Sequence, residues 1–240
     1  MKPIIISTED VRAVLDGRKT MMRQVMKPQP THWDDGECVY DKDSIVGPEL
    51  YNPIRVDKDG EQYPGKEVYG IYSDDGEYGC KAPCQPGDVL WVRETWKPED
   101  YQLIDGIWSC AIVYKVGGLN GRVHWPEGSG SIYDLCLVWH SPVAMPREAA
   151  RLFLRVTDVR VERLNQITNN DILREGFRSE SCKICVHDGG SGCDHCFAIL
   201  NPFRKSWDAR NAKRGYGWDA NPWVWVIVFE VTKEGDDVQV

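Results

Sequence analysis

The feature that most constrains the fold is an apolar run near the end of the chain, Trp223-Val-Trp-Val-Ile-Val-Phe229. β-Branched and aromatic residues favour strands, and a strand that is apolar on both faces has to be covered on both faces. The run is too short to cross a membrane, because a spanning helix takes about 20 residues. It therefore predicts a central strand of a sheet or barrel, extending from Trp223 to Val231.

Other segments have the same extended character, and only a few have helical signals. Ser7 and Asp10 form a capping-box pair that opens a first helix, and Gly17 stands where that helix stops. Thr168 and Asp171 form a second such pair, for a short helix that Gly176 ends. A third helix is expected at about 197–210. Strands are expected at 20–26, 89–96, 111–114, 135–139 and 152–161.

Short strands with few helices and no strand–helix–strand alternation predict an α+β fold. The simplest version is a small β-barrel with flanking helices, in which residues 1–240 form a single domain. Residues 31–84 are rich in Pro, Gly and acidic residues and lack periodicity, so they predict an acidic, loop-rich insertion with at most short strands.

The net charge is −8, and its distribution matters more than its sum. Residues 31–78 hold thirteen Asp and Glu against four Lys and Arg, a net of −9, which leaves +1 for the rest of the chain. Local basic groups on such a chain can still bind phosphate. Lysines scattered over a solvated face are the alternative interpretation.

Four cysteines, Cys182, Cys185, Cys193 and Cys196, form two Cys-x-x-Cys pairs around a glycine-rich segment. This spacing predicts a structural Zn²⁺ with four sulfur ligands, held by a zinc-binding insertion at 178–198. The alternatives are two redox pairs or unrelated thiols, and His187 or His195 could replace one sulfur. The total of nine cysteines is odd, which favours reduced thiols and a cytoplasmic setting over a disulfide framework.

Two cationic segments are candidate ligand sites. The first is Arg18, Lys19 and Thr20 with Arg23, where a helix end passes into an extended segment. Lys and Arg also gather at helix ends because of the helix dipole, so this signal is weak alone. The second combines Lys213 and Arg214 with aromatic residues on which unpaired bases could stack. Those rings are Tyr216 and Trp218, which could instead plug the end of a barrel. Arg93 and Glu94 are further candidates for the cleft wall or for an internal salt bridge.

The order of these motifs resembles the ASCH (activating signal cointegrator homology) family, within the PUA-like superfamily. The matching motifs are the first helix with Gly17-Arg-Lys-Thr20, the Pro86-Gly-Asp88 turn, Trp91-Val-Arg-Glu-Thr-Trp96 and the helix ending Glu175-Gly176. Ala144–Ala149 and Gly215–Trp223 resemble the longer members found in phages and prophages. The resemblance implies a PUA-like barrel and a cleft that binds RNA.

Some small members of that family are amidohydrolases that act on N4-acetylcytidine with a lysine, a threonine and a glutamate. Carried over, the lysine matches Lys19 and the glutamate matches Glu175. The threonine position is Met22, which cannot act as a nucleophile, and Thr20 should face differently on an extended segment. Gln24 stands where the enzymes have an arginine. The departures favour binding over hydrolysis, with Lys19 and Glu175 as a ligand-binding pair or a simple ion pair.

The sequence thus predicts a cytoplasmic ASCH-type protein, phage-encoded, that binds RNA or a nucleoside and has no membrane segment. A hydrolase acting on a modified nucleoside or on RNA, through Lys19, Thr20 and Glu175, is the first alternative. A phage protein-interaction module, docking a host or phage protein on residues 31–78 or on the cysteine segment, is the second.

Overall fold

The apolar run near the end of the chain forms the strand β15 (Trp223–Thr232), as predicted, and it lies between two other strands. Its residues from Trp223 to Ile227 are all buried. The computed structural model describes residues 1–30, 33–34, 37–38, 45–73, 78–104, 106–124, 138–178 and 194–232. Among these residues, no helix is both long enough and apolar enough to cross a membrane.

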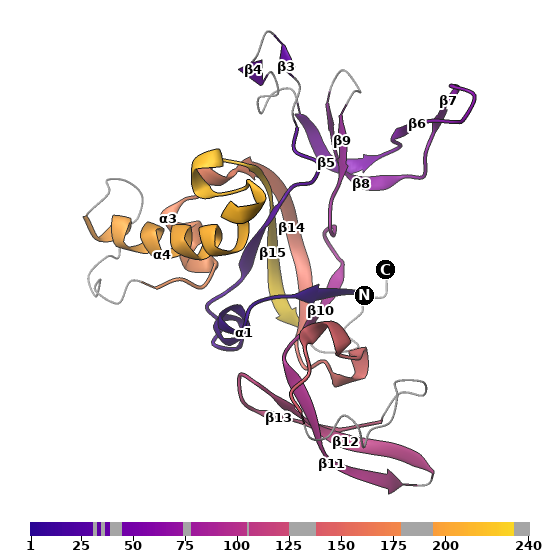
Figure 1. The fold of residues 1–240 in the computed structure, drawn as a ribbon, viewed down its shortest axis with the longest axis vertical. Coiled ribbons are helices and arrows are strands. Elements are labelled where there is room, and N and C mark those ends of the chain that lie inside the picture. Colours follow the sequence, from indigo (N-terminus) through magenta and orange to yellow (C-terminus); the bar gives the residue numbers. More distant parts are fainter. Residues whose placement is uncertain are drawn as a thin grey trace. The chain divides into compact units, whose positions relative to one another are not determined.

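The architecture is mixed α+β, with strands in several sheets and few helices (Figure 1). The largest sheet has five strands in the order β1-β10-β14-β15-β2, and the described strands close no barrel. β1 and β10 are parallel, whereas β10–β14 and β15–β2 are antiparallel pairs. These strands are β1 (Lys2–Ile5), β2 (Met21–Val25), β10 (Val89–Arg93), β14 (Phe153–Arg163) and β15.

The chain divides into two compact units. The first comprises residues 1–20, 87–156 and 229–240, and the second comprises residues 21–86 and 157–228. β14 and β15 each contribute residues to both units.

The first unit contains the first helix and a three-stranded antiparallel sheet. Ser7 caps α1 (Thr8–Leu15) with the predicted capping box, and the left-handed Gly17 (φ +68°) follows its last turn. The sheet packs onto a core that includes Trp91, Trp96 and Tyr114. Its strands are β11 (Trp96–Ile104), β12 (Ile107–Tyr114) and β13 (Leu119–His124), and two 3-10 turns, Pro142–Ala144 and Arg147–Ala149, follow.

The second unit contains two further helices and a second core. Thr168 caps α3 (Asn169–Arg174) with the other predicted capping box. α4 (Asp194–Asn211) is longer than the predicted 197–210 and contains Pro202. Phe203 and Trp207 project from α4 into an apolar cluster that includes Val224 and Val226 of β15. The described part of this unit also contains the short 3-10 turns Leu164–Gln166, Ala212–Arg214 and Trp218–Ala220.

The acidic segment of this unit has more regular structure than its composition predicts. Its described residues form a three-stranded sheet in the order β5-β8-β9, with Ile71 and Cys80 buried. β-Branched and aromatic residues at 45–51 and 68–73 pair across the two strands, and this long-range pairing gives no local periodic signal. The strands are β3 (Trp33–Asp34), β4 (Glu37–Cys38), β5 (Ile45–Tyr51), β6 (Ile54–Val56), β7 (Gln62–Pro64), β8 (Val68–Ser73) and β9 (Gly79–Lys81).

One predicted strand, at 135–139, lies largely outside the described residues.

Candidate functional site

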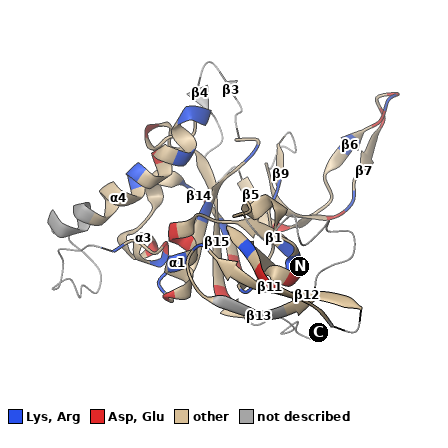
Figure 2. Cartoon of the chain, turned by 60° about the horizontal axis from the view of Figure 1, so that its bottom comes forward, with Lys and Arg blue, Asp and Glu red and all other residues tan. Residues whose placement is uncertain are grey.

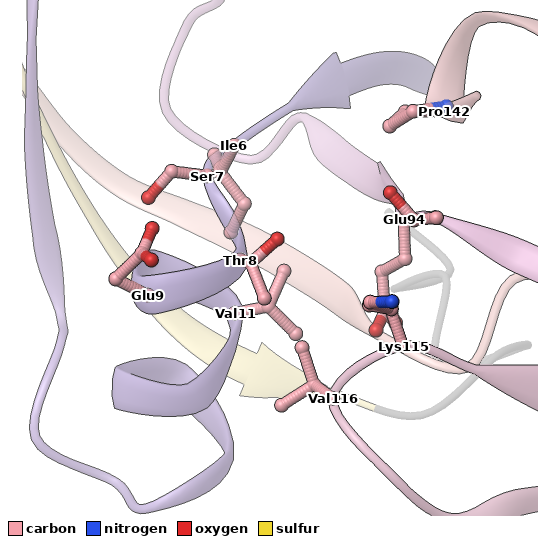
Figure 3. A pocket seen from close by; sticks show the side chains of 10 residues that line it. Ile6, Ser7, Thr8, Glu9, Val11, Glu94, Lys115, Val116 and Pro142 are labelled. Carbon is pink, nitrogen blue, oxygen red and sulfur yellow. The ribbon is translucent and has the colours of Figure 1, made fainter.

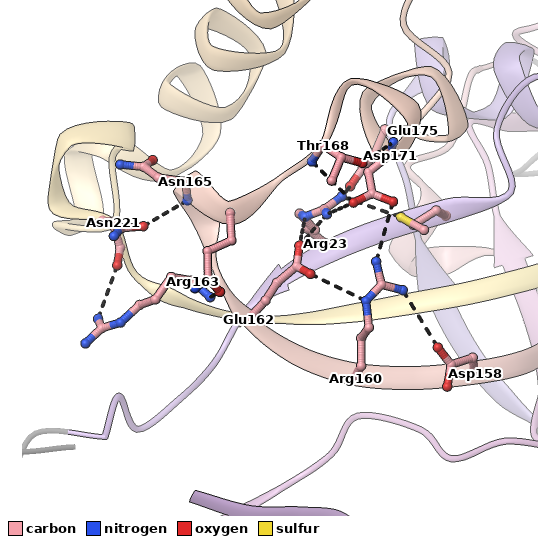
Figure 4. A network of polar contacts seen from close by, with 12 residues as sticks. Arg23, Asp158, Arg160, Glu162, Arg163, Asn165, Thr168, Asp171, Glu175 and Asn221 are labelled. Carbon is pink, nitrogen blue, oxygen red and sulfur yellow. Dashed lines mark hydrogen bonds and ion pairs between the residues drawn. The ribbon is translucent and has the colours of Figure 1, made fainter. Parts of the chain in front are cut away.

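A buried arginine in the second unit is surrounded by carboxylates (Figure 4). Arg23 lies on β2, and its side chain is 0% exposed. Its guanidinium donates to Glu175 Oε1 at 3.0 Å and to Asp171 Oδ2 at 3.1 Å, and it also contacts Glu162 Oε1. All three partners are acidic, so the guanidinium is fully engaged within the protein.

A second cation borders the same carboxylates. Arg160 lies two residues before Glu162 on β14, so the two side chains leave the same face of the strand. Its nitrogens are 3.4 Å from Glu162 Oε2, 3.5 Å from Asp171 Oδ1 and 3.7 Å from Asp158 Oδ2. Arg160 is half-buried, and so it connects the buried network to the surface.

The network shifts the pKa values of its members in opposite directions. Burial acts to lower the pKa of Arg23, but the charges of Glu175 and Glu162 overcome this effect and raise it. Burial acts to raise the pKa of Asp171, whereas the Arg23 charge and hydrogen bonds from Thr168 hold that pKa below its usual value of 3.8. Both groups are therefore charged at neutral pH, and the network is an assembly of ion pairs.

In the first unit, Lys19 is also buried and paired. It is 3% exposed, and its Nζ lies 3.0 Å from Asp10 Oδ1. Asp10 is the capping-box residue of α1, so one carboxylate both caps the helix and binds the lysine. Arg18 pairs with Asp16 at 2.9 Å. Lys19 belongs to the first unit and Glu175 to the second, so their joint site stays a prediction.

Thr20 and Met22 lie on either side of the start of β2. The Thr20 carbonyl accepts a hydrogen bond from the Phe229 backbone at 3.0 Å. Met22 is 5% exposed and is aligned with Ile227 of β15. A buried thioether in an apolar setting offers no nucleophile at this position.

The second predicted segment is solvent-facing and cationic. Lys213 and Arg214 are exposed, and Arg214 donates to Asn211 Oδ1 at 2.7 Å. Lys27 Nζ lies 5.3 Å from the centroid of the half-buried Tyr216 ring, which is a cation–π distance. Figure 2 shows Lys and Arg along α4 and the turn that follows it. Lys27 therefore lies over the Tyr216 ring, while Lys213 and Arg214 are exposed three and two residues before Tyr216 in the chain.

The aromatic segment is anchored to α4 by hydrogen bonds. Trp207 Nε1 donates to the Tyr216 carbonyl at 2.7 Å, and the Trp218 backbone donates to Asp208 Oδ1 at 2.6 Å. The Trp218 ring meets Phe203 edge-on, with centroids 6.1 Å apart. Trp218 therefore packs partly on the core, while Tyr216 is held at the surface beside the lysines.

Arg93 has a different environment. It lies at the end of β10, with its guanidinium 4.7 Å from the Trp91 ring centroid. Its buried Nε has no hydrogen-bond partner among the described residues. Arg93 therefore stacks on an aromatic ring and takes part in none of the described ion pairs.

The expectation of a structural zinc has to be corrected. A zinc site needs four ligands around one point, and in the described ranges no group of three or more His, Cys, Asp or Glu could hold a metal ion. Cys182, Cys185 and Cys193 lie outside the described residues. Cys196 lies on α4, but the structure does not describe its side chain. For the part of the chain that the structure describes, the zinc prediction is wrong. Cys80, Cys84 and Cys110 are buried.

Several important residues were not predicted from the sequence as parts of a site. Glu162 and Arg160 were missed, although their two-residue spacing on a strand is a usable signal. Asp171 was predicted only as a cap, and it also binds Arg23. From the sequence, Lys27 contributes only to the net charge. Its position over the Tyr216 ring depends on the tertiary structure.

No protein-family model, no curated protein and no solved structure matches this chain. The ASCH resemblance therefore depends on the sequence motifs alone.

Proposed function

We propose that this protein binds single-stranded nucleic acid, and RNA in particular, through a surface on its second unit. The surface comprises Lys27, Lys213, Arg214 and Tyr216, and we call it the Tyr216 surface. The observation that supports it best is the Lys27 ammonium 5.3 Å from the Tyr216 ring centroid, with two further exposed cations three and two residues before Tyr216 in the chain.

The chemistry of the Tyr216 surface suits an unpaired strand. Exposed cations bind phosphates by charge, and an aromatic face stacks a base of any kind, which contributes about 1–3 kcal/mol per base. The hydrogen bond from Trp207 holds the Tyr216 backbone in place, so little order has to be gained on binding. The protein's overall negative charge does not oppose this, because the Debye length at physiological salt is only about 8 Å.

Arg23, Lys19 and Glu175 have a supporting role in this proposal. Arg23 is engaged by three carboxylates and Lys19 by Asp10, so these cations stabilise the two units rather than offer a free charge to phosphate. Glu175 is engaged by Arg23, and Met22 lacks a nucleophile. These facts favour binding over hydrolysis. A PUA-like barrel and membership of the ASCH family are the finer parts of the same proposal.

The test is fluorescence anisotropy with short labelled RNA and DNA strands over a range of salt concentrations. We expect Tyr216→Ala to weaken binding by about 5- to 150-fold, which corresponds to one stacked base. The double variant Lys213→Gln, Arg214→Gln should weaken binding to all sequences. It should also reduce the salt slope by about 0.7 for each phosphate that is no longer neutralised.

The matched control removes two exposed cations from the acidic segment, in the variant Arg55→Gln, Lys66→Gln. It changes the net charge by the same amount and should leave the affinity and the salt slope as in the unmodified protein. If the two double variants weaken binding equally, the attraction is a general charge effect and the Tyr216 surface is not the site. If the unmodified protein binds no strand, the proposed function is wrong.

A further inference from the structure

The first unit contains a pocket of about 320 Å³ that none of the site residues above uses (Figure 3). Its lining comes from four separate segments: the start of α1, the link between β10 and β11, the turn after β12, and the 3-10 turn at 142–144. Ligand pockets usually have volumes of about 300–1,000 Å³, so this one suits a single ring system with few substituents. The lining residues are Ile6, Ser7, Thr8, Glu9, Val11, Glu94, Thr95, Lys115, Val116 and Pro142.

The pocket wall combines apolar surface with a buried carboxylate. Glu94 is 3% exposed, and both of its oxygens accept from Arg151, at 3.0 and 2.7 Å. Arg151 is itself fixed, because its guanidinium lies 4.0 Å from the Tyr114 ring centroid. Each carboxylate oxygen can accept more than one hydrogen bond. Glu94 is thus a neutralised, rigid acceptor in the wall of a small cavity.

The pocket wall also includes a cation that contacts an exposed indole. Lys115 lines the pocket, and its Nζ lies 5.3 Å from the centroid of the Trp139 ring, which is 44% exposed. Lys97 Nζ lies 5.5 Å from the same centroid and pairs with Glu99. Within the described ranges Lys115 pairs with no carboxylate, and its ring contact keeps the ammonium beside the pocket.

We propose that this pocket is a nucleotide site, in which the base enters the cavity and Lys115 binds the phosphate at the mouth. The apolar side chains Val11, Val116 and Pro142 would contact the faces and edges of the base. Glu94 accepts a hydrogen bond from an exocyclic amine, which favours cytosine over uracil among the small bases. The remaining carboxylate, Glu9, lies in the first turn of α1, where the helix dipole offsets its charge.

Trp139 bears on whether the bound nucleotide is free or is part of a strand. An exposed indole beside the phosphate stacks the next base of a strand, whereas a free nucleotide has no such base. The inference that the nucleotide belongs to a strand rests on the proposal that the protein binds single-stranded nucleic acid. The inference that the pocket binds a nucleotide does not depend on that proposal.

The experiment measures two ligands in parallel on the full chain. Cytidine and uridine 5′-monophosphates are titrated by calorimetry, and a short labelled oligocytidylate is titrated by anisotropy. Val116→Phe fills the pocket and should abolish nucleotide binding, and Lys115→Gln should weaken it. Trp139→Ala should weaken oligonucleotide binding by about 5- to 150-fold, and it should weaken mononucleotide binding no more than Lys115→Gln does. Val56→Phe is the matched control, because Val56 is 61% exposed on β6 and lies outside the pocket lining.

The outcomes separate this inference from the proposed function. If cytidine monophosphate binds and only Val116→Phe blocks it, the pocket is a nucleotide site even if no strand binds. If strands bind through the Tyr216 surface while neither nucleotide binds and Val116→Phe has no effect, the pocket inference is overturned and the proposed function stands. Equal affinity for the cytidine and uridine nucleotides would overturn the role of Glu94. Circular dichroism confirms that each variant is folded.

Discussion

Replacing Arg23 by methionine tests whether the carboxylate network stabilises the second unit. The change removes the guanidinium that binds Glu162, Asp171 and Glu175, and it leaves a side chain of similar length. Arg160 remains 3.4 Å from Glu162 and 3.5 Å from Asp171, so two of the carboxylates keep a cation. Glu175, with its side chain 4% exposed, loses its guanidinium partner.

Removing one partner of a buried ion pair costs about 3–5 kcal/mol, and the compensation by Arg160 places this case near the lower end. We therefore expect the free energy of unfolding at pH 7 to fall by about 3 kcal/mol, measured by urea denaturation. The thermal midpoint should fall by about 6–12 °C, at 2–4 °C for each kcal/mol.

The pH dependence separates the ion pairs from ordinary packing. The folded-state pKa of Asp171 lies below its usual 3.8, so its stabilising effect is complete above that value and is lost as the pH falls through the folded-state pKa. The difference between the unmodified protein and the variant should therefore shrink below about pH 4. The double variant Arg23→Met, Glu175→Gln should recover part of the stability, because the carboxylate that the guanidinium no longer balances is replaced by a neutral amide.

Arg12→Met is the control, since Arg12 is an exposed residue of α1 and should cost no more than about 0.5 kcal/mol. A cost for Arg23→Met below about 1 kcal/mol, the size of an exposed ion pair, would refute the reasoning. A cost that is unchanged between pH 7 and low pH would refute it as well.

Three other predictions follow from single contacts. Asp171→Asn should lower the free energy of unfolding at neutral pH and make it depend less on pH in the acid range, measured by urea denaturation at a series of pH values. An unchanged pH dependence in the acid range would contradict the lowered pKa of Asp171. Trp207→Phe keeps an aromatic ring but loses the 2.7 Å bond to the Tyr216 carbonyl, so it should cost about 1–2 kcal/mol and speed hydrogen exchange at 215–218; unchanged exchange there would show that the bond does not anchor the segment. Lys19→Met leaves the Asp10 carboxylate without its 3.0 Å partner and should cost about 3 kcal/mol in thermal or urea unfolding, whereas Lys2→Met, at an exposed pair, should cost less than about 1 kcal/mol.

Local signals predicted part of the secondary structure. Capping boxes depend on residues three apart, so Ser7 with Asp10 and Thr168 with Asp171 identified the starts of α1 and α3 correctly. The apolar run at 223–229 identified an interior strand because consecutive apolar residues put apolar side chains on both faces of the strand. The acidic segment gave no such signal, since its strands depend on partners far away in the chain.

The candidate sites were harder to predict, because charge in a sequence does not reveal what is paired. Arg23 and Lys19 were expected to face a ligand, and each is buried against carboxylates of its own unit. The pocket beside Lys115 and Trp139 could not be predicted at all, because its wall comes from segments that are far apart along the chain.

The sequence alone determined the interior strand near the end of the chain and where two helices begin. Those properties depend on neighbours within a few residues, where backbone and side-chain preferences act directly. Only the tertiary structure decided which cations remain exposed, as at Lys213, and which are neutralised, as at Arg23. The reason is physical: a buried charge has to find an opposite charge wherever the fold places one, and that partner can lie at any distance along the chain.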